Sequence, residues 1–236
     1  MRVTKALTAV AAVAVLALAG CGSSRATTSP ATPSSNGVSD LTADQILAKT
    51  GAAAKEQSSV HVAGKGSSGG TALALDLKLR KGGGGVGTIT LGTNPIQIIT
   101  TGTDVYIKAD KSFWASQGNG SAATVIGDRW VKASATTSSF ASLAQLGDFS
   151  TAIDTFLKPD SAITKGDVGT ASGVPAIALV STSGKLWVAT TGSPLPVQID
   201  SGTAGDALKF TDWGATVDVP VPADKDVLDL SKLSGK

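Results

Sequence analysis

The chain has 236 residues, of which 42% are hydrophobic, 16% are charged and 4% are aromatic. This composition is too apolar for a disordered chain and predicts a folded domain. With one cysteine and one histidine, the chain offers no intramolecular disulfide and no thiolate or imidazole ligand set for zinc, haem or an iron–sulfur cluster. We therefore expect no cofactor, and a hydrolase of the Ser–His–Asp or Cys–His type would depend on His61 alone.

Residues 1–20 predict a lipoprotein signal peptide. The first five residues carry two basic side chains, and an apolar run from Ala6 to Ala19 follows, too short to span a bilayer comfortably. The run ends in Leu18-Ala19-Gly20-Cys21, which is typical of the lipobox where bacterial lipoproteins are acylated and cut. Cys21 is thus the expected lipidation site, and we expect a protein held by lipid at the extracytoplasmic face of the cell membrane.

The charge that remains after this segment is balanced. Removing residues 1–20 takes away two of the 20 basic residues and none of the 18 acidic ones, which leaves 18 of each. No block of like charge follows, so we expect no nucleic-acid partner. Residues 21–39 combine the lipidated cysteine with a segment rich in Ser, Thr and Pro, which predicts a flexible tether. Residues 40–236 are expected to form a single domain.

The domain is predicted to open with a helix that continues to about Gln57. Asp40 or Thr42 can serve as its N-cap, and Ile46 and Leu47 would supply its inner face.

Alternating apolar residues then predict a meander of half-buried antiparallel strands. Glycine-rich and Asn-Pro turns separate the strands at hairpin spacing. Lys81–Gly87 is predicted to be a hairpin loop and not a phosphate-binding loop, because no helix follows it. The alternating residues are Val60, Val62, Leu73, Leu75, Leu77, Leu79, Ile89, Leu91, Ile96, Ile98, Val105 and Ile107.

The second half of the domain combines helices with further strands. A short strand at 129–132 precedes two helical segments, around 140–146 and at 148–157, the second beginning at Asp148. About nine strands and at most four helical segments indicate an α+β fold, in which a strongly curved antiparallel sheet wraps around helices. The later strands are predicted at Ala176–Ser181, Lys185–Ala189, Val197–Ile199 and Leu208–Trp213.

The apolar residues of the first strands, here called the leucine face, have two interpretations. They could line a concave cavity large enough for acyl chains, or they could pack with the helices as an ordinary core. The single histidine, His61, alternates with valines and is expected to be a structural residue on the polar face. Asp154 is expected on a solvated helix face, and the tryptophans in core or pocket walls.

Several motifs together resemble the actinobacterial LppX/LprG-type lipoproteins over roughly residues 41–230. They are the lipobox and tether, the strand start Ser58-Ser59-Val60-His61-Val62-Ala63-Gly64, the strand Asp104-Val105-Tyr106-Ile107, and the closing Leu208-Lys209-Phe210-Thr211-Asp212-Trp213-Gly214. The resemblance implies a LolA-like half-barrel that binds an acylated lipid or lipoglycan and carries or presents it in the cell envelope, without catalysis. It also implies a possible envelope transporter as partner.

By this resemblance, strand residues become candidate cavity lining and helical residues a candidate plug. The lining comprises Leu75, Leu77, Leu79, Ile89, Leu91, Ile96, Ile98, Val105 and Ile107, and the plug comprises Phe140, Leu143, Ile153, Phe156 and Leu157.

Two other classes of function stay open. An envelope scaffold or sensor with a filled core would bind a protein partner through an exposed edge strand, for which Thr88–Leu91 is the best candidate. An enzyme acting on cell-wall material would depend on His61 or Asp154.

Overall fold

The computed structural model describes residues 34–232 except 69, 117–119, 138–140, 142–143 and 146. The expected signal peptide, Cys21, and the plug residues Phe140 and Leu143 lie outside the described residues. Pro33–Lys236 forms one compact unit, distinct from Met1–Thr32. Three hydrophobic clusters of buried residues belong to this unit, so it holds the buried contacts that a domain needs to fold on its own.

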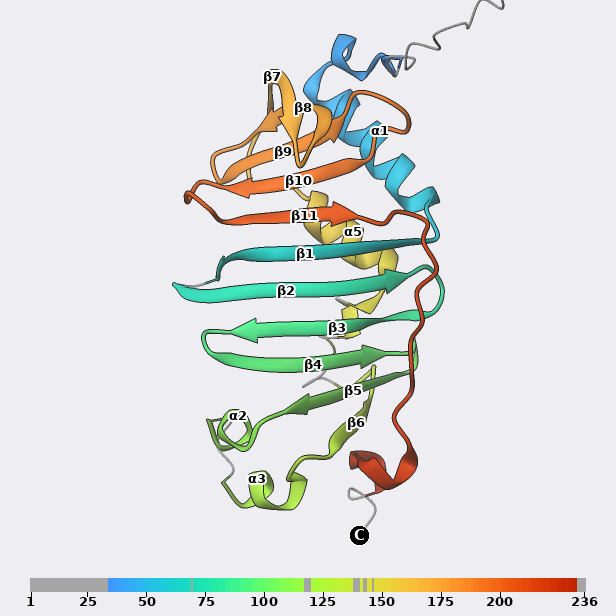
Figure 1. Cartoon of the computed structure of the whole chain (residues 1–236), viewed down its shortest axis with the longest axis vertical. Helices are drawn as coiled ribbons and strands as arrows, with labels where there is room; N and C mark the ends of the chain where they lie inside the picture. The colour runs from blue at the N-terminus through green and yellow to red at the C-terminus, as the bar shows by residue number, and fades with distance from the viewer. Residues whose placement is uncertain are drawn as a thin grey trace, which may run out of the picture. The chain divides into compact units, whose positions relative to one another are not determined.

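Twelve strands form one open, curved sheet, and helices pack against it, which confirms the expected α+β class (Figure 1). The strands are β1 (Ser59–Ser68), β2 (Thr71–Arg80), β3 (Gly84–Leu91), β4 (Asn94–Thr100), β5 (Asp104–Ala109), β6 (Trp130–Ser134), β7 (Thr164–Ala171), β8 (Val174–Val180), β9 (Gly184–Ala189), β10 (Pro196–Ser201), β11 (Ala207–Thr211) and β12 (Val227–Asp229). The α-helices are α1 (Ala43–Glu56), α2 (Lys111–Ser116), α3 (Gly120–Ile126) and α5 (Phe149–Leu157), and the 3₁₀ helices are η1 (Val38–Asp40), η2 (Asp224–Asp226) and η3 (Leu230–Lys232).

The strand order is β12-β6-β5-β4-β3-β2-β1-β11-β10-β9-β8-β7. Neighbours are antiparallel except β12 and β6, which are parallel. Strand β1 pairs with β2 on one side and with β11 on the other, so it joins the early and late halves of the chain into one sheet. Strand β7 was not predicted, because Val168 and Ala171 are its apolar residues and most of its side chains are exposed.

Thr88–Leu91 lies in β3, between β2 and β4, and is therefore not an edge strand. The prediction of an exposed docking edge at this segment was wrong. The described sheet ends at β12 and β7 instead.

The leucine face is in register across the first strands. Leu75 lies opposite Ile89, and Ile89 lies opposite Ile96. In the next row Leu77 lies opposite Gly87, where an added Cβ would come within 2.0 Å of the Asp76 carbonyl oxygen. The close approach of β3 to β2 therefore requires glycine at this position.

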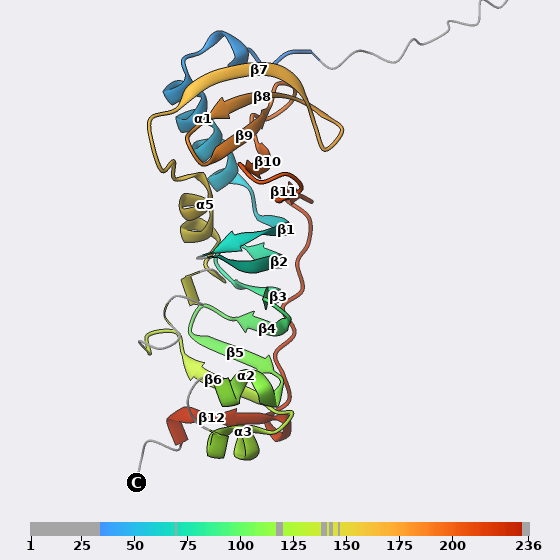
Figure 2. The same ribbon diagram turned by 90° about the vertical axis from the view of Figure 1, so that its left-hand side faces the viewer.

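Helices α1 and α5 lie on the same side of the sheet, α1 beside β8 and β9 and α5 beside β11 and β1 (Figure 2). Helix α1 begins at Thr42, one of the two predicted N-caps, in a reciprocal capping box with Gln45. Helix α5 begins at Asp148 as predicted, and its Phe149 and Ile153 are buried in the same cluster as the leucine face. Helices α2 and α3 were not predicted.

Folded structure begins before the predicted domain start at residue 40. Ser35 forms a β-bridge with Thr191, the Asn36 side-chain amide donates to the Ala189 carbonyl at 3.0 Å, and Val38 is fully buried. These residues had been assigned to the flexible tether. Their anchoring places the start of the described chain beside the β9–β10 connection.

The C-terminal strap, residues 214–226, crosses the outer face of the sheet (Figure 2). The Ser59 hydroxyl donates to the Ala215 carbonyl at 2.5 Å, and the Arg80 guanidinium donates to the Val217 carbonyl at 3.5 Å. The strap leads to β12.

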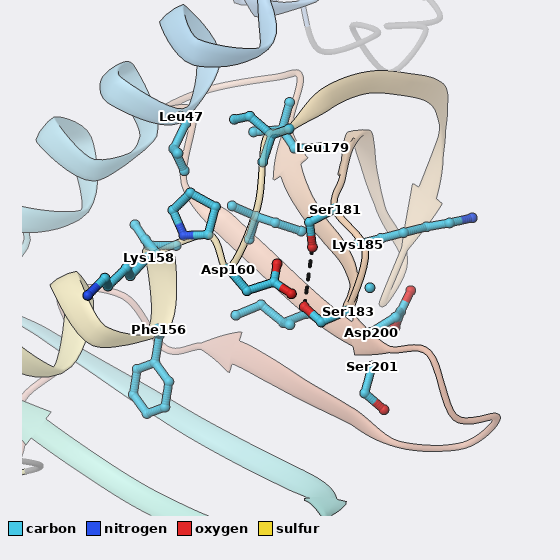
Figure 3. Close-up of a pocket in the computed structure, with 16 residues that line it drawn as sticks. Leu47, Phe156, Lys158, Asp160, Leu179, Ser181, Ser183, Lys185, Asp200 and Ser201 are labelled. Carbon is cyan, nitrogen blue, oxygen red and sulfur yellow. Dashed lines mark hydrogen bonds between the residues drawn. The ribbon is translucent and has the colours of Figure 1, made fainter.

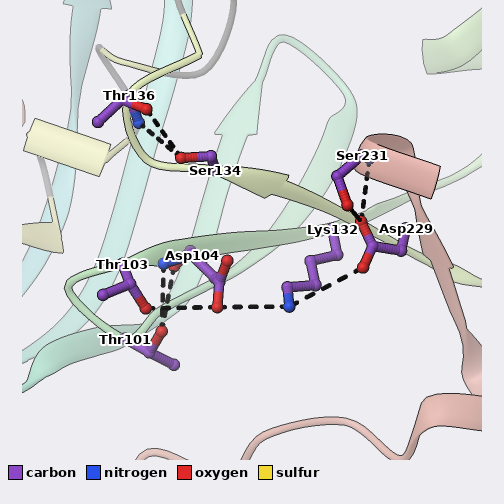
Figure 4. Close-up of polar contacts among 8 residues, drawn as sticks. All are labelled: Thr101, Thr103, Asp104, Lys132, Ser134, Thr136, Asp229 and Ser231. Atoms are coloured by element: carbon purple, nitrogen blue, oxygen red, sulfur yellow. Dashed lines mark hydrogen bonds and ion pairs between the residues drawn. The ribbon is translucent and has the colours of Figure 1, made fainter. Parts of the chain in front are cut away.

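An ion-pair cluster holds β12 in place (Figure 4). The Lys132 Nζ lies 3.4 Å from an Asp104 carboxylate oxygen and 4.0 Å from an Asp229 carboxylate oxygen. Partial burial lowers the pKa of Lys132, but its interactions with Tyr106, Asp104 and Asp229 outweigh this and raise the pKa above the usual value. The cluster thus ties β5, β6 and β12 together.

Candidate functional site

A cleft of ≈ 270 Å³ lies where the end of α5 meets strands β8, β9 and β10 and helix α1 (Figure 3). Phe156 and Leu157 come from α5, Leu47 from α1, and Ile163 from the segment that enters β7. The volume is close to the lower end of the range of about 300–1,000 Å³ that is typical of small-molecule sites.

The floor of the cleft is one register row of the sheet. Leu179 of β8 lies opposite Leu186 of β9, which lies opposite Ile199 of β10. Because strand side chains alternate between faces, this row puts three apolar side chains side by side on the helix-covered face. The row supplies a continuous apolar surface of the width of three strands.

The rim of the cleft is polar and carries both signs of charge. Lys158, Asp160, Ser183 and Lys185 are exposed residues that line it. Desolvation raises the pKa of Asp160, but hydrogen bonds from Ser181, Ser183 and Thr182 outweigh it and hold the pKa below its usual value. Asp160 is therefore an anion at neutral pH.

The connection between α5 and β7 is fastened to the β8–β9 turn. The Thr182 hydroxyl donates to an Asp160 carboxylate oxygen at 3.1 Å, and the Thr182 backbone N–H donates to the Ser161 hydroxyl at 3.1 Å. The hydroxyls of Ser181 and Ser183 lie 3.3 Å apart on the same turn (Figure 3). These bonds fix the shape of the rim.

The arrangement is suited to binding. Within the described part of the chain, no group of three or more His, Cys, Asp or Glu side chains is placed to hold a metal ion. The groups that line the cleft are apolar side chains inside and hydroxyls, lysines and carboxylates at the rim. Such a surface can enclose an alkyl chain and leave a polar group at the rim.

Two of the predicted site residues, Phe156 and Leu157, line this cleft. The others do not. Leu91 is exposed, with 38% of its surface accessible, because it lies at the end of β3. The remaining described residues are buried in a packed core with α5, and they are Leu75, Leu77, Leu79, Ile89, Ile96, Ile98, Val105, Ile107 and Ile153.

The leucine face leaves little space. A void of ≈ 10 Å³ remains beside Leu77, Leu79 and Ile98, about the space of a single water molecule. Phe149 and Ile153 of α5 fill the place where a cavity was expected. Of the two interpretations of this face, the structure shows the packed core, and the open space lies beyond it toward β8–β10.

Five residues that line the cleft were not predicted as lining: Leu47, Ile163, Leu179, Leu186 and Ile199. A local signal was present, since strands were predicted around the last three. Their pairing into one row could not be deduced, because it depends on which strands become neighbours.

The residues considered for catalysis lie apart. His61 faces outward on β1, with its Nε2 2.9 Å from an Asp76 carboxylate oxygen and its Nδ1 3.4 Å from an Asp212 carboxylate oxygen. Asp154 lies on α5, across the sheet, and pairs with Lys55 of α1 at 2.5 Å. Both have the structural environments that were predicted.

Trp187 and Trp213 pack in different hydrophobic clusters. The Trp187 indole donates to an Asp200 carboxylate oxygen at 2.6 Å and packs in a small cluster with Ala171 and Ala176. Trp213 stacks on Phe210, with ring centroids 6.2 Å apart. These contacts fit the predicted roles in core and pocket walls.

None of the helices in the described residues is both long enough and apolar enough to cross a membrane.

No family model and no curated protein matches the chain. Among solved structures, the crystal structure of LprF from Mycobacterium bovis is similar to it, with 17% sequence identity, a TM-score of 0.48, and coverage of 77% of this chain and 97% of that chain.

Proposed function

We propose that this protein is a membrane-anchored lipoprotein that holds an acylated lipid or lipoglycan by an alkyl chain in the cleft between α5 and β8–β10. The observation that carries the proposal is the apolar row Leu179–Leu186–Ile199, in a cleft that has Phe156 at one end and a polar rim. This site replaces the leucine face as the place where a chain is held.

The energy of such binding follows from burial alone. Each methylene removed from water contributes about 0.8 kcal/mol, so ten buried methylenes contribute roughly 8 kcal/mol. That free energy corresponds to a dissociation constant of about 1 μM before the cost of ordering the chain. The rim carries Lys158 and Asp160, which favours a polar head group without a large net charge.

The anchor is the second part of the proposal. Acylation at Cys21 would tie the protein to the outer side of the cell membrane. Residues 22–33 between this cysteine and the first described residue could span at most roughly 40 Å when extended. A carrier at this position would exchange its ligand with the membrane or with an envelope transporter.

Binding can be tested on the unit Pro33–Lys236 with a photoreactive diazirine analogue of palmitic acid. We expect cross-links on peptides that contain Leu157, Leu186 or Ile199. Ile163→Trp should fill the cleft and abolish the cross-links, whereas Val168→Trp, the same addition at a side chain that is 61% exposed on β7, should not. Equal labelling of both variants, or labelling spread over the surface, would refute the site.

The anchor can be tested separately in the full chain. Growth of an expressing bacterium with an alkynyl fatty acid should label the wild-type protein, and Cys21→Ala should remove both the label and the membrane association. Labelling that persists in Cys21→Ala would show that the anchor lies elsewhere.

A further inference from the structure

Phe156 occupies a boundary between the cleft and the packed core. Its side chain lines the cleft, and the same residue packs against the buried cluster that contains the leucine face. Figure 3 shows Phe156 at one end of the lining residues, away from Leu47 and Leu179. The opposite side of its ring therefore faces the protein interior.

The ring is held in this position by an aromatic column. Phe156 meets Phe210 edge to face, with ring centroids 5.8 Å apart and an interplanar angle of 78°. Phe210 is 4% exposed and stacks in turn on Trp213. A side chain buttressed in this way by buried rings stays where it is when a ligand enters the cleft.

The leucine face begins directly behind this column. Phe210 of β11 lies opposite Val62 of β1, and Val62 lies opposite Leu77 of β2. The inner face is thus apolar from the cleft floor to the leucine face, and the Phe156 ring separates the open part from the filled part.

We propose that Phe156 sets the length of the alkyl chain that the cleft accepts. This inference rests on the proposed function. The exposed rim residues Lys158 and Asp160 receive the polar end of the ligand, so the terminal methyl group points inward and stops at the Phe156 ring. Chains longer than the distance from rim to ring leave their excess methylenes in water.

The expected result is a change of slope when the logarithm of the binding affinity is plotted against the chain length of the ligand. Each methylene buried up to the ring strengthens binding about fourfold, which is the equivalent of about 0.8 kcal/mol, and each methylene beyond it adds little. Replacing a large buried side chain by alanine can open a dry void of about 150 Å³ that holds a benzene-sized ligand. Phe156→Ala should therefore extend the rising part of the series by on the order of six carbon atoms.

The test is a displacement series on the unit Pro33–Lys236. An anthroyloxy fatty acid is bound as a fluorescent probe and displaced by octanoic, decanoic, lauric, myristic, palmitic and stearic acids. Phe149→Ala is the matched control, because Phe149 lies in the same helix, is 1% exposed in the same core cluster, and does not line the cleft. Phe156→Leu and Phe149→Leu repeat the comparison with a smaller loss of packing, in case the alanine variants fail to fold.

We expect Phe156→Ala to bind fatty acids with an affinity that keeps rising at chain lengths where the affinities of the wild type and both Phe149 variants have levelled off. Phe156→Leu should show the same effect to a smaller extent. Levelling at the wild-type length in the Phe156 variants, or an equal extension in the Phe149 variants, would overturn the inference and leave the proposed function intact. If none of the acids displaces the probe from the wild type, the proposed function fails and the inference fails with it.

Discussion

The hydroxyl of Thr50 offers a direct test of the helix–sheet packing. Thr50 lies on the inner side of α1 and is fully buried, and no described residue forms a hydrogen bond with its Oγ1. A buried hydroxyl without a partner costs about 1–3 kcal/mol of desolvation. Valine has the same shape and a similar helix propensity, so Thr50→Val removes the hydroxyl and little else.

We expect Thr50→Val to raise the free energy of unfolding by about 1–2 kcal/mol. In a domain of this size that corresponds to roughly 2–8 °C in melting temperature. Urea titrations of the two proteins followed by circular dichroism would measure the difference. An unchanged dependence of the unfolding free energy on urea concentration would show that both proteins expose the same surface on unfolding.

Thr155→Val is the matched control. Thr155 is exposed on α5, and its hydroxyl already donates to the Thr151 carbonyl at 2.8 Å. This change should move the free energy of unfolding by less than about 0.5 kcal/mol. If Thr50→Val proved less stable than the wild type, the hydroxyl would have a partner and the described packing of α1 would be wrong.

Three further predictions follow from the packing and the charges. Leu77→Ala should lower the free energy of unfolding by about 2–5 kcal/mol, because Leu77 is 3% exposed in the filled core. The diazirine probe should still label the folded molecules of this variant. Loss of labelling with little loss of stability would restore the leucine face as the binding site. Gly51→Ala should stabilise α1 by up to about 1 kcal/mol, since its new Cβ meets nothing within 4 Å. Gly87→Ala should instead destabilise the sheet, because its Cβ would come within 2.0 Å of the Asp76 carbonyl oxygen. Denaturant titrations that rank the two variants in the other order would contradict the β2–β3 register. Hydrogen bonds from Ser231, together with the charge of Lys132, hold the pKa of Asp229 below its usual value despite partial desolvation. The stability that Asp229 contributes is therefore present above about pH 4 and is lost as the pH falls through the lowered pKa. Asp229→Asn should reduce this loss of stability at acid pH, and an unchanged loss would show that Asp229 is not involved.

The strands and hairpins of the first half could be predicted because the information is local. The leucines of β2 alternate with Asp76, Lys78 and Arg80, and in the structure the leucines face inward and these three residues are exposed. The loop predicted over Lys81–Gly87 is shorter in the structure: residues 81–83 connect β2 to β3, and the glycines from Gly84 onward already belong to β3. The helix caps at Thr42 and Asp148 were also predictable, since each depends on residues a few positions away.

The order of the strands could not be predicted in the same way. Thr88–Leu91 has the composition of an edge strand, yet β2 and β4 flank it because each is joined to β3 by a tight hairpin. The floor of the cleft depends on the pairing of β8 with β9 and of β9 with β10, in which a shift of one residue would turn Leu186 to the other face.

The helix positions explain the other difference. Phe156 and Leu157 were predicted to plug a cavity on the basis of family resemblance, and they do cover an apolar surface. Ile153 and Phe149, about one and two turns earlier in α5, are buried in the same cluster as the leucine face. Which residues of α5 pack in the core and which line the cleft depends on how the helix docks on the sheet. This docking cannot be deduced from a local sequence pattern.

The pairing of β1 with both β2 and β11 has a consequence for folding. Residues 59–68 and 71–80 can form a hairpin as soon as both segments are available, but the other edge of β1 has to wait until residues 207–211 arrive. Contacts separated by this much chain form slowly, because the entropy of closing the intervening loop is lost before the contacts are made. During that interval β1 presents an unpaired edge beside an apolar face, which is the arrangement most prone to association with other chains. We therefore expect the maturation of this protein to be limited by the β1–β11 closure, and hydrogen exchange after refolding should protect β2 before β11.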